Sequence, residues 1–81
     1  MTTAQAITAI QATGANLTAD DINNLKGATD AQLQYIVQGW INAGKVRGKD
    51  TAEKLIATLK QVPEWVEVAT QIVKVVAGIF A

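Results

Sequence analysis

Few side chains in this sequence could act as catalysts or metal ligands, and those few are carboxylates. The 81 residues include no histidine, cysteine or serine, so the commonest general base, metal ligands and nucleophiles are missing. Asp20 and Asp21 are adjacent, and neighbouring side chains on a helix point about 100° apart, so they cannot converge as an acid–base pair. We interpret them as acids at the positive end of a helix dipole.

Glu64 and Glu67 lie one helical turn apart and could together face a cation. Hard cations such as Ca²⁺ take about six to eight oxygen ligands, so a solvated helix face explains two carboxylates better than a metal site does. We therefore predict no catalytic residue, no metal site, no cofactor and no small-molecule substrate. The protein is not expected to be an enzyme.

A single basic cluster, Lys45, Arg47 and Lys49, lies in a glycine-flanked segment between two predicted helices and could contact phosphate groups. Asp50 and Glu53 follow it at the expected start of the next helix, where they would repel a nucleic-acid backbone. Three cations also supply few phosphate contacts, and the net charge of the chain is zero. Nucleic acid binding is therefore our third hypothesis, and we do not expect nucleic acid to be the main partner.

The elements that hold these residues are predicted to be helices throughout. Apolar residues recur at the i, i+3, i+4, i+7 spacing of a helix face, most clearly from Leu33 to Ile41 and from Ala52 to Val62. The fold class is all-α, a compact bundle of four to five short helices in a single domain, residues 1–81. The expected helices cover residues 4–13, 19–26, 30–43, 51–61 and 64–79.

Threonines, acids and glycines mark the helix ends. Three pairs have, or come close to, the spacing of a capping box: Thr18 with Asp21, Thr29 with Gln32, and Asp50 with Glu53. Thr3 is the expected N-cap of the first helix, and Gly14 is expected in the left-handed conformation after it. Gly39 lies inside a helix at a cost of about 1 kcal/mol relative to alanine, which predicts that a neighbouring helix approaches closely there.

The last predicted helix is apolar over most of its surface. Its polar residues form one narrow stripe: Glu64, Glu67, Gln71 and Lys74. Such a helix is normally buried, so one interpretation is a central helix wrapped by the other four. The alternative is a face used for oligomerisation or membrane contact.

Neither end of the chain resembles a targeting or spanning segment. Met-Thr-Thr-Ala-Gln lacks the basic and apolar regions of a signal peptide. The apolar segment after residue 62 contains Pro63, two glutamates and Lys74, whereas a spanning helix needs about 20 mostly apolar residues. The compartment is not fixed by the sequence, and a cytoplasmic protein or part of an assembled particle is the default expectation.

Residues 64–81, with the sequence EWVEVATQIVKVVAGIFA, resemble the closing helix of leaderless helical bacteriocins. Those peptides are similar in forming a compact helical bundle with several tryptophans and lysines. The resemblance covers under a quarter of the chain, which is neutral where those peptides are strongly cationic. It implies a membrane-active or membrane-surface peptide, and this is our second hypothesis. Independently of the resemblance, Trp65 could lie at a membrane surface, because tryptophan rings favour that zone.

Our first hypothesis is a non-catalytic helical interaction or structural module that binds a copy of itself or another protein, as in a subunit of a larger assembly. The predicted interface consists of Val66, Val73, Val76, Ile79 and Phe80. Burying about 400 Å² of this surface would contribute about 10 kcal/mol before the cost of association.

Overall fold

The computed structural model describes residues 2–80 and confirms the all-α fold class. Within this range there are five α-helices, one 3₁₀ turn and no strand. The elements are α1 (Thr3–Ala12), α2 (Ala19–Asn23), α3 (Asp30–Asn42), α4 (Gly48–Leu59), η1 (Pro63–Trp65) and α5 (Val66–Ile79).

Two of the predicted capping boxes are present. Thr18 accepts a hydrogen bond from the amide of Asp21, and the Asp21 carboxylate accepts one from the amide of Thr18 at 3.0 Å. Thr29 and Gln32 make the same reciprocal pair at the start of α3. These contacts satisfy amides that the first turn of a helix leaves unpaired, so the boundaries follow from local sequence.

Two predicted caps were wrong. The first helix is capped by Thr2, whose hydroxyl accepts from the amide of Gln5, and not by Thr3. The fourth helix begins at Gly48 after Arg47, without a side-chain cap. Asp50 therefore lies within the first turn of α4, where a carboxylate favours the positive end of the dipole but does not cap it.

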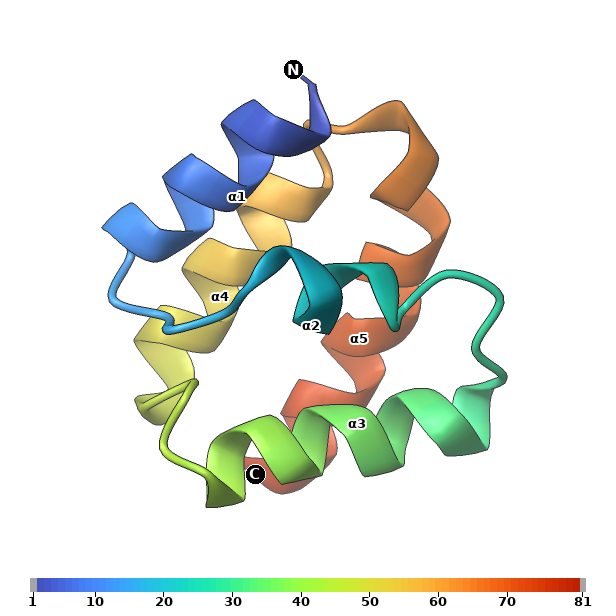
Figure 1. The fold of residues 1–81 in the computed structure, drawn as a ribbon. Helices are drawn as coiled ribbons and strands as arrows, with labels where there is room; N and C mark the ends of the chain where they lie inside the picture. Colours follow the sequence, from blue (N-terminus) through green and yellow to red (C-terminus); the bar gives the residue numbers. More distant parts are fainter. Residues whose placement is uncertain (1, 81) are drawn as a thin grey trace.

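The contacts between the helices form one continuous series through the molecule (Figure 1). α1 lies beside α4 and also contacts α2, while α5 packs against both α3 and α4. α3 crosses one end of the molecule, and the start of α1 and the end of α5 lie at opposite ends of the view in Figure 1. α4 therefore connects the N-terminal half of the fold to α5.

The core is made mostly of aliphatic side chains and includes Trp65, which is 0% exposed. Trp40 is also buried, as predicted. α5 contributes Ala69, Ile72 and Val76 to this core. The interpretation of α5 as a helix wrapped by all the others was wrong, because α3 and α4 cover one side of it and Val66 on another side is exposed.

Gly39 does not mark a close helix contact. A Cβ atom built on Gly39 would meet no atom within 4 Å, and the residue is exposed on α3. The close approach predicted from the sequence is therefore wrong, and the glycine has no packing role among the described residues. By contrast, Gly44 has a φ of +75°, in the left-handed region that side chains other than glycine rarely adopt.

The substitution Gly39→Ala is accordingly expected to stabilise the protein by about 0.5–1 kcal/mol, because alanine loses less backbone entropy in a helix and meets no neighbour. Gly44→Ala should instead destabilise it by about 1–2 kcal/mol, owing to the left-handed backbone. Urea unfolding followed by circular dichroism measures both changes. A loss of stability in Gly39→Ala would mean that a neighbour does occupy the space above this residue.

Candidate functional site

Lys45, the first residue of the predicted phosphate-binding cluster, is held in an internal ion pair. Its Nζ donates to both carboxylate oxygens of Asp21, at 3.1 and 2.9 Å. Its backbone carbonyl accepts a hydrogen bond from the amide of Asn16 at 2.8 Å. One residue thus connects the α3–α4 turn to both the α1–α2 turn and α2, and its charge is already neutralised.

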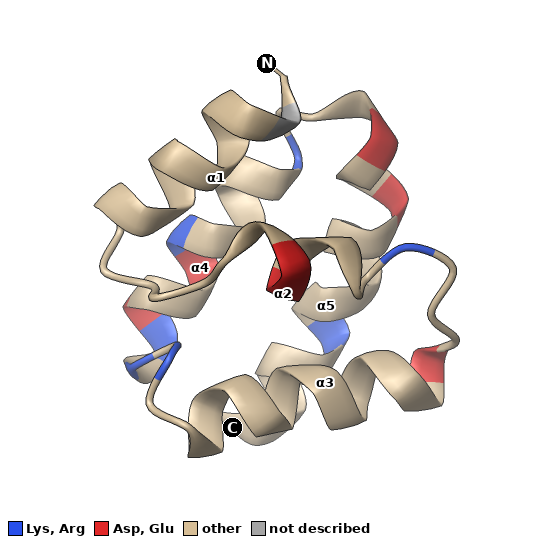
Figure 2. Cartoon of the chain, viewed as in Figure 1, with Lys and Arg blue, Asp and Glu red and all other residues tan. Residues whose placement is uncertain are grey.

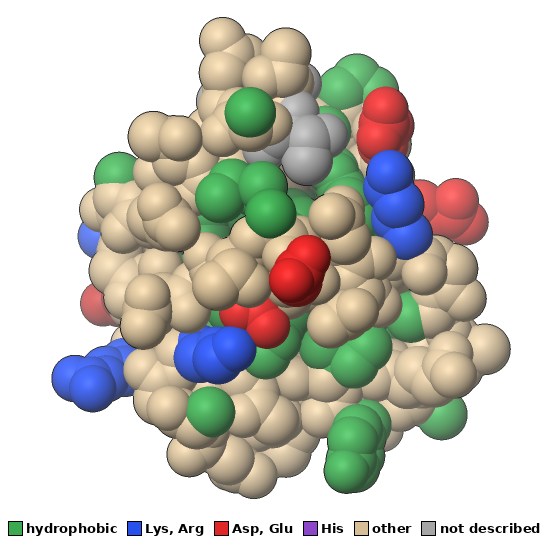
Figure 3. Space-filling model, viewed as in Figure 1, with side chains coloured by type: hydrophobic (Ala, Val, Ile, Leu, Met, Phe, Trp, Pro, Cys, Tyr) green, Lys and Arg blue, Asp and Glu red, His purple; other side chains and the backbone are tan. Residues whose placement is uncertain are grey.

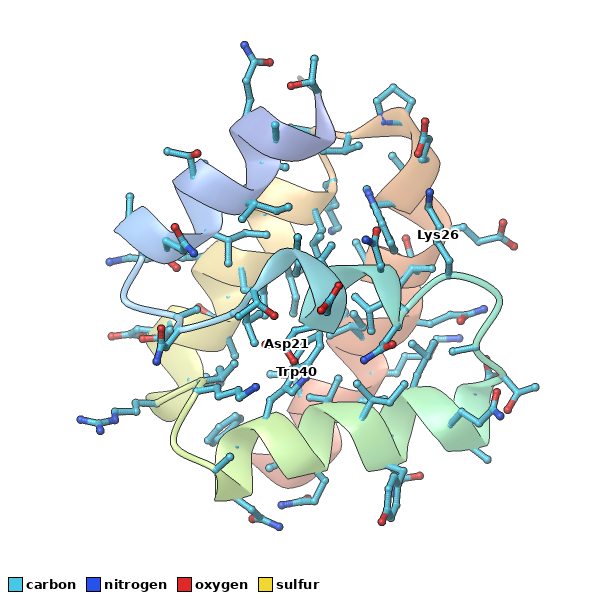
Figure 4. All side chains as sticks on the ribbon, in the orientation of Figure 1. Asp21, Lys26 and Trp40 are labelled. Carbon is cyan, nitrogen blue, oxygen red and sulfur yellow. The ribbon has the colours of Figure 1, made fainter. Side chains whose placement is uncertain are left out.

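The surroundings of the Asp21 carboxylate lower its pKa. Partial burial raises the pKa of Asp21, but hydrogen bonds from Thr18 and Lys45, with the positive charge of Lys45, outweigh that effect and leave the pKa below its ordinary value. Figure 4 shows Asp21 pointing from α2 toward the part of α3 that carries Trp40. The pair is therefore a partly buried tertiary contact between α2 and the α3–α4 turn.

The other two cations do not join Lys45 in a phosphate site. Arg47 is exposed, and its Nε donates to the carbonyl of Gly44 in its own turn at 3.3 Å. Lys49 is exposed on the first turn of α4. Charged residues are distributed over several elements in Figure 2, and on the face drawn in Figure 3 they do not gather into one basic patch.

The two glutamates predicted to share a helix face lie in different elements, Glu64 in η1 and Glu67 in α5. Glu64 pairs with Lys26 at 3.7 Å, and both side chains are well exposed. The Nζ of Lys26 lies 5.7 Å from the ring centroid of Trp65, within range of a cation–π contact. Lys26, on the turn after α2 (Figure 4), was not singled out from the sequence, because the contact depends on where that turn lies relative to Trp65 and Glu64, which are much further along the chain.

The five residues of the predicted interface occupy three different settings. Val66 and Val73 are 43% and 39% exposed, so they are available to a partner. Val76 is only 5% exposed and belongs to the core. Ile79 and Phe80 are half-buried against that core. Only part of the predicted set therefore forms a surface.

The exposed valines belong to a regular stripe along α5. Counting from Val66, the residues at steps of 4, 3, 4 and 3 are Thr70, Val73, Ala77 and Phe80. This is the spacing of the contact positions in a coiled coil. We call these five residues the α5 seam. Thr70 and Ala77 are exposed and were missed from the sequence, because only large apolar side chains were considered.

The seam has the chemistry of a helix contact. Ala77 is small, and the hydroxyl of Thr70 already donates to the carbonyl of Val66 at 3.0 Å, which reduces the cost of burying it. On the α4 side the seam adjoins a shallow groove of about 250 Å³, lined by Lys49, Glu53 and Ile56 of α4 together with Val73, Val76, Ala77 and Phe80. The groove extends the apolar surface beyond a single helix.

A second, larger groove of about 860 Å³ lies between α3 and α5. Its lining mixes the apolar Leu33, Val75 and Ile79 with amide side chains such as Gln34 and Gln71. Asp30 and Lys74 are the charged groups of its lining, so it holds one acid and no pair of carboxylates.

Comparisons with protein-family models, with curated proteins and with solved structures found no match to this chain. None of the helices in the described range combines the length and the apolar character needed to cross a bilayer. The same residues contain no group of three or more acids that could hold a metal ion.

Proposed function

We propose that this protein is a non-catalytic helical module that binds a second copy of itself through the α5 seam. The observation that carries the proposal is the placement of exposed apolar side chains. Three large hydrophobic residues are well exposed in the described range, and two of them, Val66 and Val73, lie on the seam at coiled-coil spacing. The third, Tyr35, lies alone on α3.

The size of the seam predicts weak association. α5 has 14 residues and is therefore about 21 Å long, so one face of it is smaller than the roughly 800 Å² per partner of a standard interface. Burial of about 400 Å² in total would contribute about 10 kcal/mol, against association costs of about 4–15 kcal/mol. Dimers should therefore form at high protein concentration and dissociate on dilution.

The membrane-surface hypothesis receives less support. It needs the indole of Trp65 at a lipid surface, yet this ring is fully buried in the folded chain. Opening the bundle to release it would expose much of the core. Self-association needs no such rearrangement, because Val66 and Val73 are already accessible.

The substitution Val73→Glu is expected to abolish self-association without unfolding the protein. It places a charge at the middle of the seam, where burial without a partner is costly, but the side chain is accessible in the monomer. Sedimentation equilibrium from about 10 µM to 1 mM, a range suited to a small interface, should show a concentration-dependent mass for the native chain and a constant monomer mass for the variant.

Tyr35→Glu provides the matched control, because it adds the same charge at an apolar residue that is 83% exposed on another helix. This variant should associate like the native chain. The proposal is wrong if the native chain stays monomeric over the whole range, or if both variants associate as it does.

A further inference from the structure

Within α5 itself, charged side chains lie along one edge of the seam, whereas the charged groups on the other side, Lys49 and Glu53, belong to α4. Glu67 and Lys74 each follow a seam residue, Val66 and Val73, by one position, so they lie on the same edge two helical turns apart. Both are exposed, and neither takes part in the two ion pairs found among residues 2–80, Lys26–Glu64 and Lys45–Asp21. The edge therefore presents an acid toward the start of α5 and a base toward its end.

We propose that two copies pair their α5 helices in antiparallel orientation about a two-fold axis near residues 71–72, with Glu67 of each copy beside Lys74 of the partner subunit. This inference rests on the proposed self-association and adds its geometry. A two-fold axis reverses the second helix, so the acid of one copy meets the base of the other twice in each dimer. The surface is thus complementary in charge to itself.

A parallel pairing would not use these charges. In a parallel coiled coil the edge holding Glu67 and Lys74 faces the opposite edge of the partner helix. On this chain the opposite edge is formed by Ala69 and Val76, which are apolar and buried in the core. Glu67 and Lys74 would then meet no opposite charge on α5 of the partner, and the charged groups on that side of the seam would be Lys49 and Glu53 of α4.

The antiparallel register also matches large residues to small ones. With the axis near residues 71–72, Val73 lies opposite Thr70 of the partner subunit. Val66 lies opposite Ala77 of the partner subunit. The four seam residues of α5 itself thus form layers that each pair a valine with a smaller side chain, while Phe80, just after α5, has no seam residue opposite it.

Disulfide trapping tests this register directly, because the native chain has no cysteine. In an oxidised equimolar mixture of Val66→Cys and Ala77→Cys at high protein concentration, the mixed dimer should form preferentially, since these positions face each other. Each variant alone should crosslink only at the level of Tyr35→Cys, an exposed control, because two copies of either position would lie about 16 Å apart along the axis.

A parallel dimer would give the reverse pattern, with efficient crosslinking of Val66→Cys to itself and no crosslink between Val66→Cys and Ala77→Cys in the mixture. That result would overturn the register and leave the self-association proposal intact. A native chain that is monomeric at every concentration in sedimentation would overturn both. The two failures are therefore distinguishable.

Charge exchange gives a second test of the same geometry. Glu67→Lys and Lys74→Glu should each weaken dimerisation by about threefold to tenfold, because each places like charges together twice in the dimer. The double variant Glu67→Lys with Lys74→Glu should restore the native dissociation constant. Equal weakening by the single and double variants would show that these residues do not meet across the interface.

Discussion

Trp65→Ala is expected to lower the free energy of unfolding by about 3–5 kcal/mol, the range for removing a large aromatic side chain from a core. Trp65 is fully buried at the start of the last helix, where α5 meets the rest of the bundle. A domain of 81 residues has a total stability of about 4–12 kcal/mol, so the variant would lose much of its folded population.

Guanidinium unfolding followed by circular dichroism at 222 nm measures this loss. Trp65→Phe should cost less, because it leaves a smaller cavity and removes an indole N–H that has no acceptor among the described residues. Tyr35→Ala, on an exposed face of α3, should change stability by less than about 0.5 kcal/mol. A stable Trp65→Ala variant with native cooperativity would contradict the central place of this side chain in the core.

Asp21→Ala is expected to cost about 2–3 kcal/mol. The carboxylate accepts two hydrogen bonds from Lys45 and one from the amide of Thr18, and only 15% of its side chain is exposed. The N-cap Thr18 stays in place, and the loss is that of hydrogen bonds to a charged group, which contribute about 1.5–3 kcal/mol. The variant also leaves the Lys45 ammonium, itself partly buried, without its partner.

Asp20→Ala is the matched control, because Asp20 is the adjacent acid, is exposed and makes neither contact. It should lose only the dipole contribution of about 0.3–1 kcal/mol. Equal losses in urea unfolding of the two variants would show that the Lys45 contact contributes little to stability.

The same carboxylate gives the protein a defined acid sensitivity. The pKa of Asp21 is lower in the folded than in the unfolded chain, so its contribution is complete above the ordinary aspartate pKa of about 3.9. It is lost as the pH falls through the lower folded value. The difference in free energy of unfolding between the native protein and Asp21→Ala should therefore be largest near neutral pH. It should shrink as the solution becomes strongly acidic.

The parts of the fold that sequence reasoning found are those decided within a few residues. Capping boxes such as Thr18 with Asp21 join residues three positions apart, so their spacing is sufficient evidence. The start of α4 was predicted wrongly because no side chain caps this helix. In sequence, an acid such as Asp50 in the first turn looks the same as an acid at the N-cap position. A short-range pattern cannot separate those two cases.

The contacts that sequence reasoning missed are tertiary. Lys45 lies 24 residues from Asp21, and nothing local in either segment indicates that the α3–α4 turn meets α2. The sequence also did not indicate which side of α5 faces the core, because valines lie on several sides of this helix. Only the positions of α3 and α4 decide that Val76 is buried and Val73 is at the surface. Periodicity predicts a helix and its polar stripe, but not which apolar side a neighbour will cover.

The five residues of α2 are too few to stay helical alone, since isolated helices shorter than about 12–15 residues are marginal in water. Yet Leu17, Ile22 and Leu25, in and around this segment, are at most 1% exposed. Detaching the segment would expose all three side chains to water at once. It would also remove the two contacts of Lys45 with this part of the chain, the ion pair with Asp21 and the hydrogen bond from the amide of Asn16. α2 therefore cannot act as a hinged flap, and its amide protons should exchange with solvent only when the whole molecule opens cooperatively.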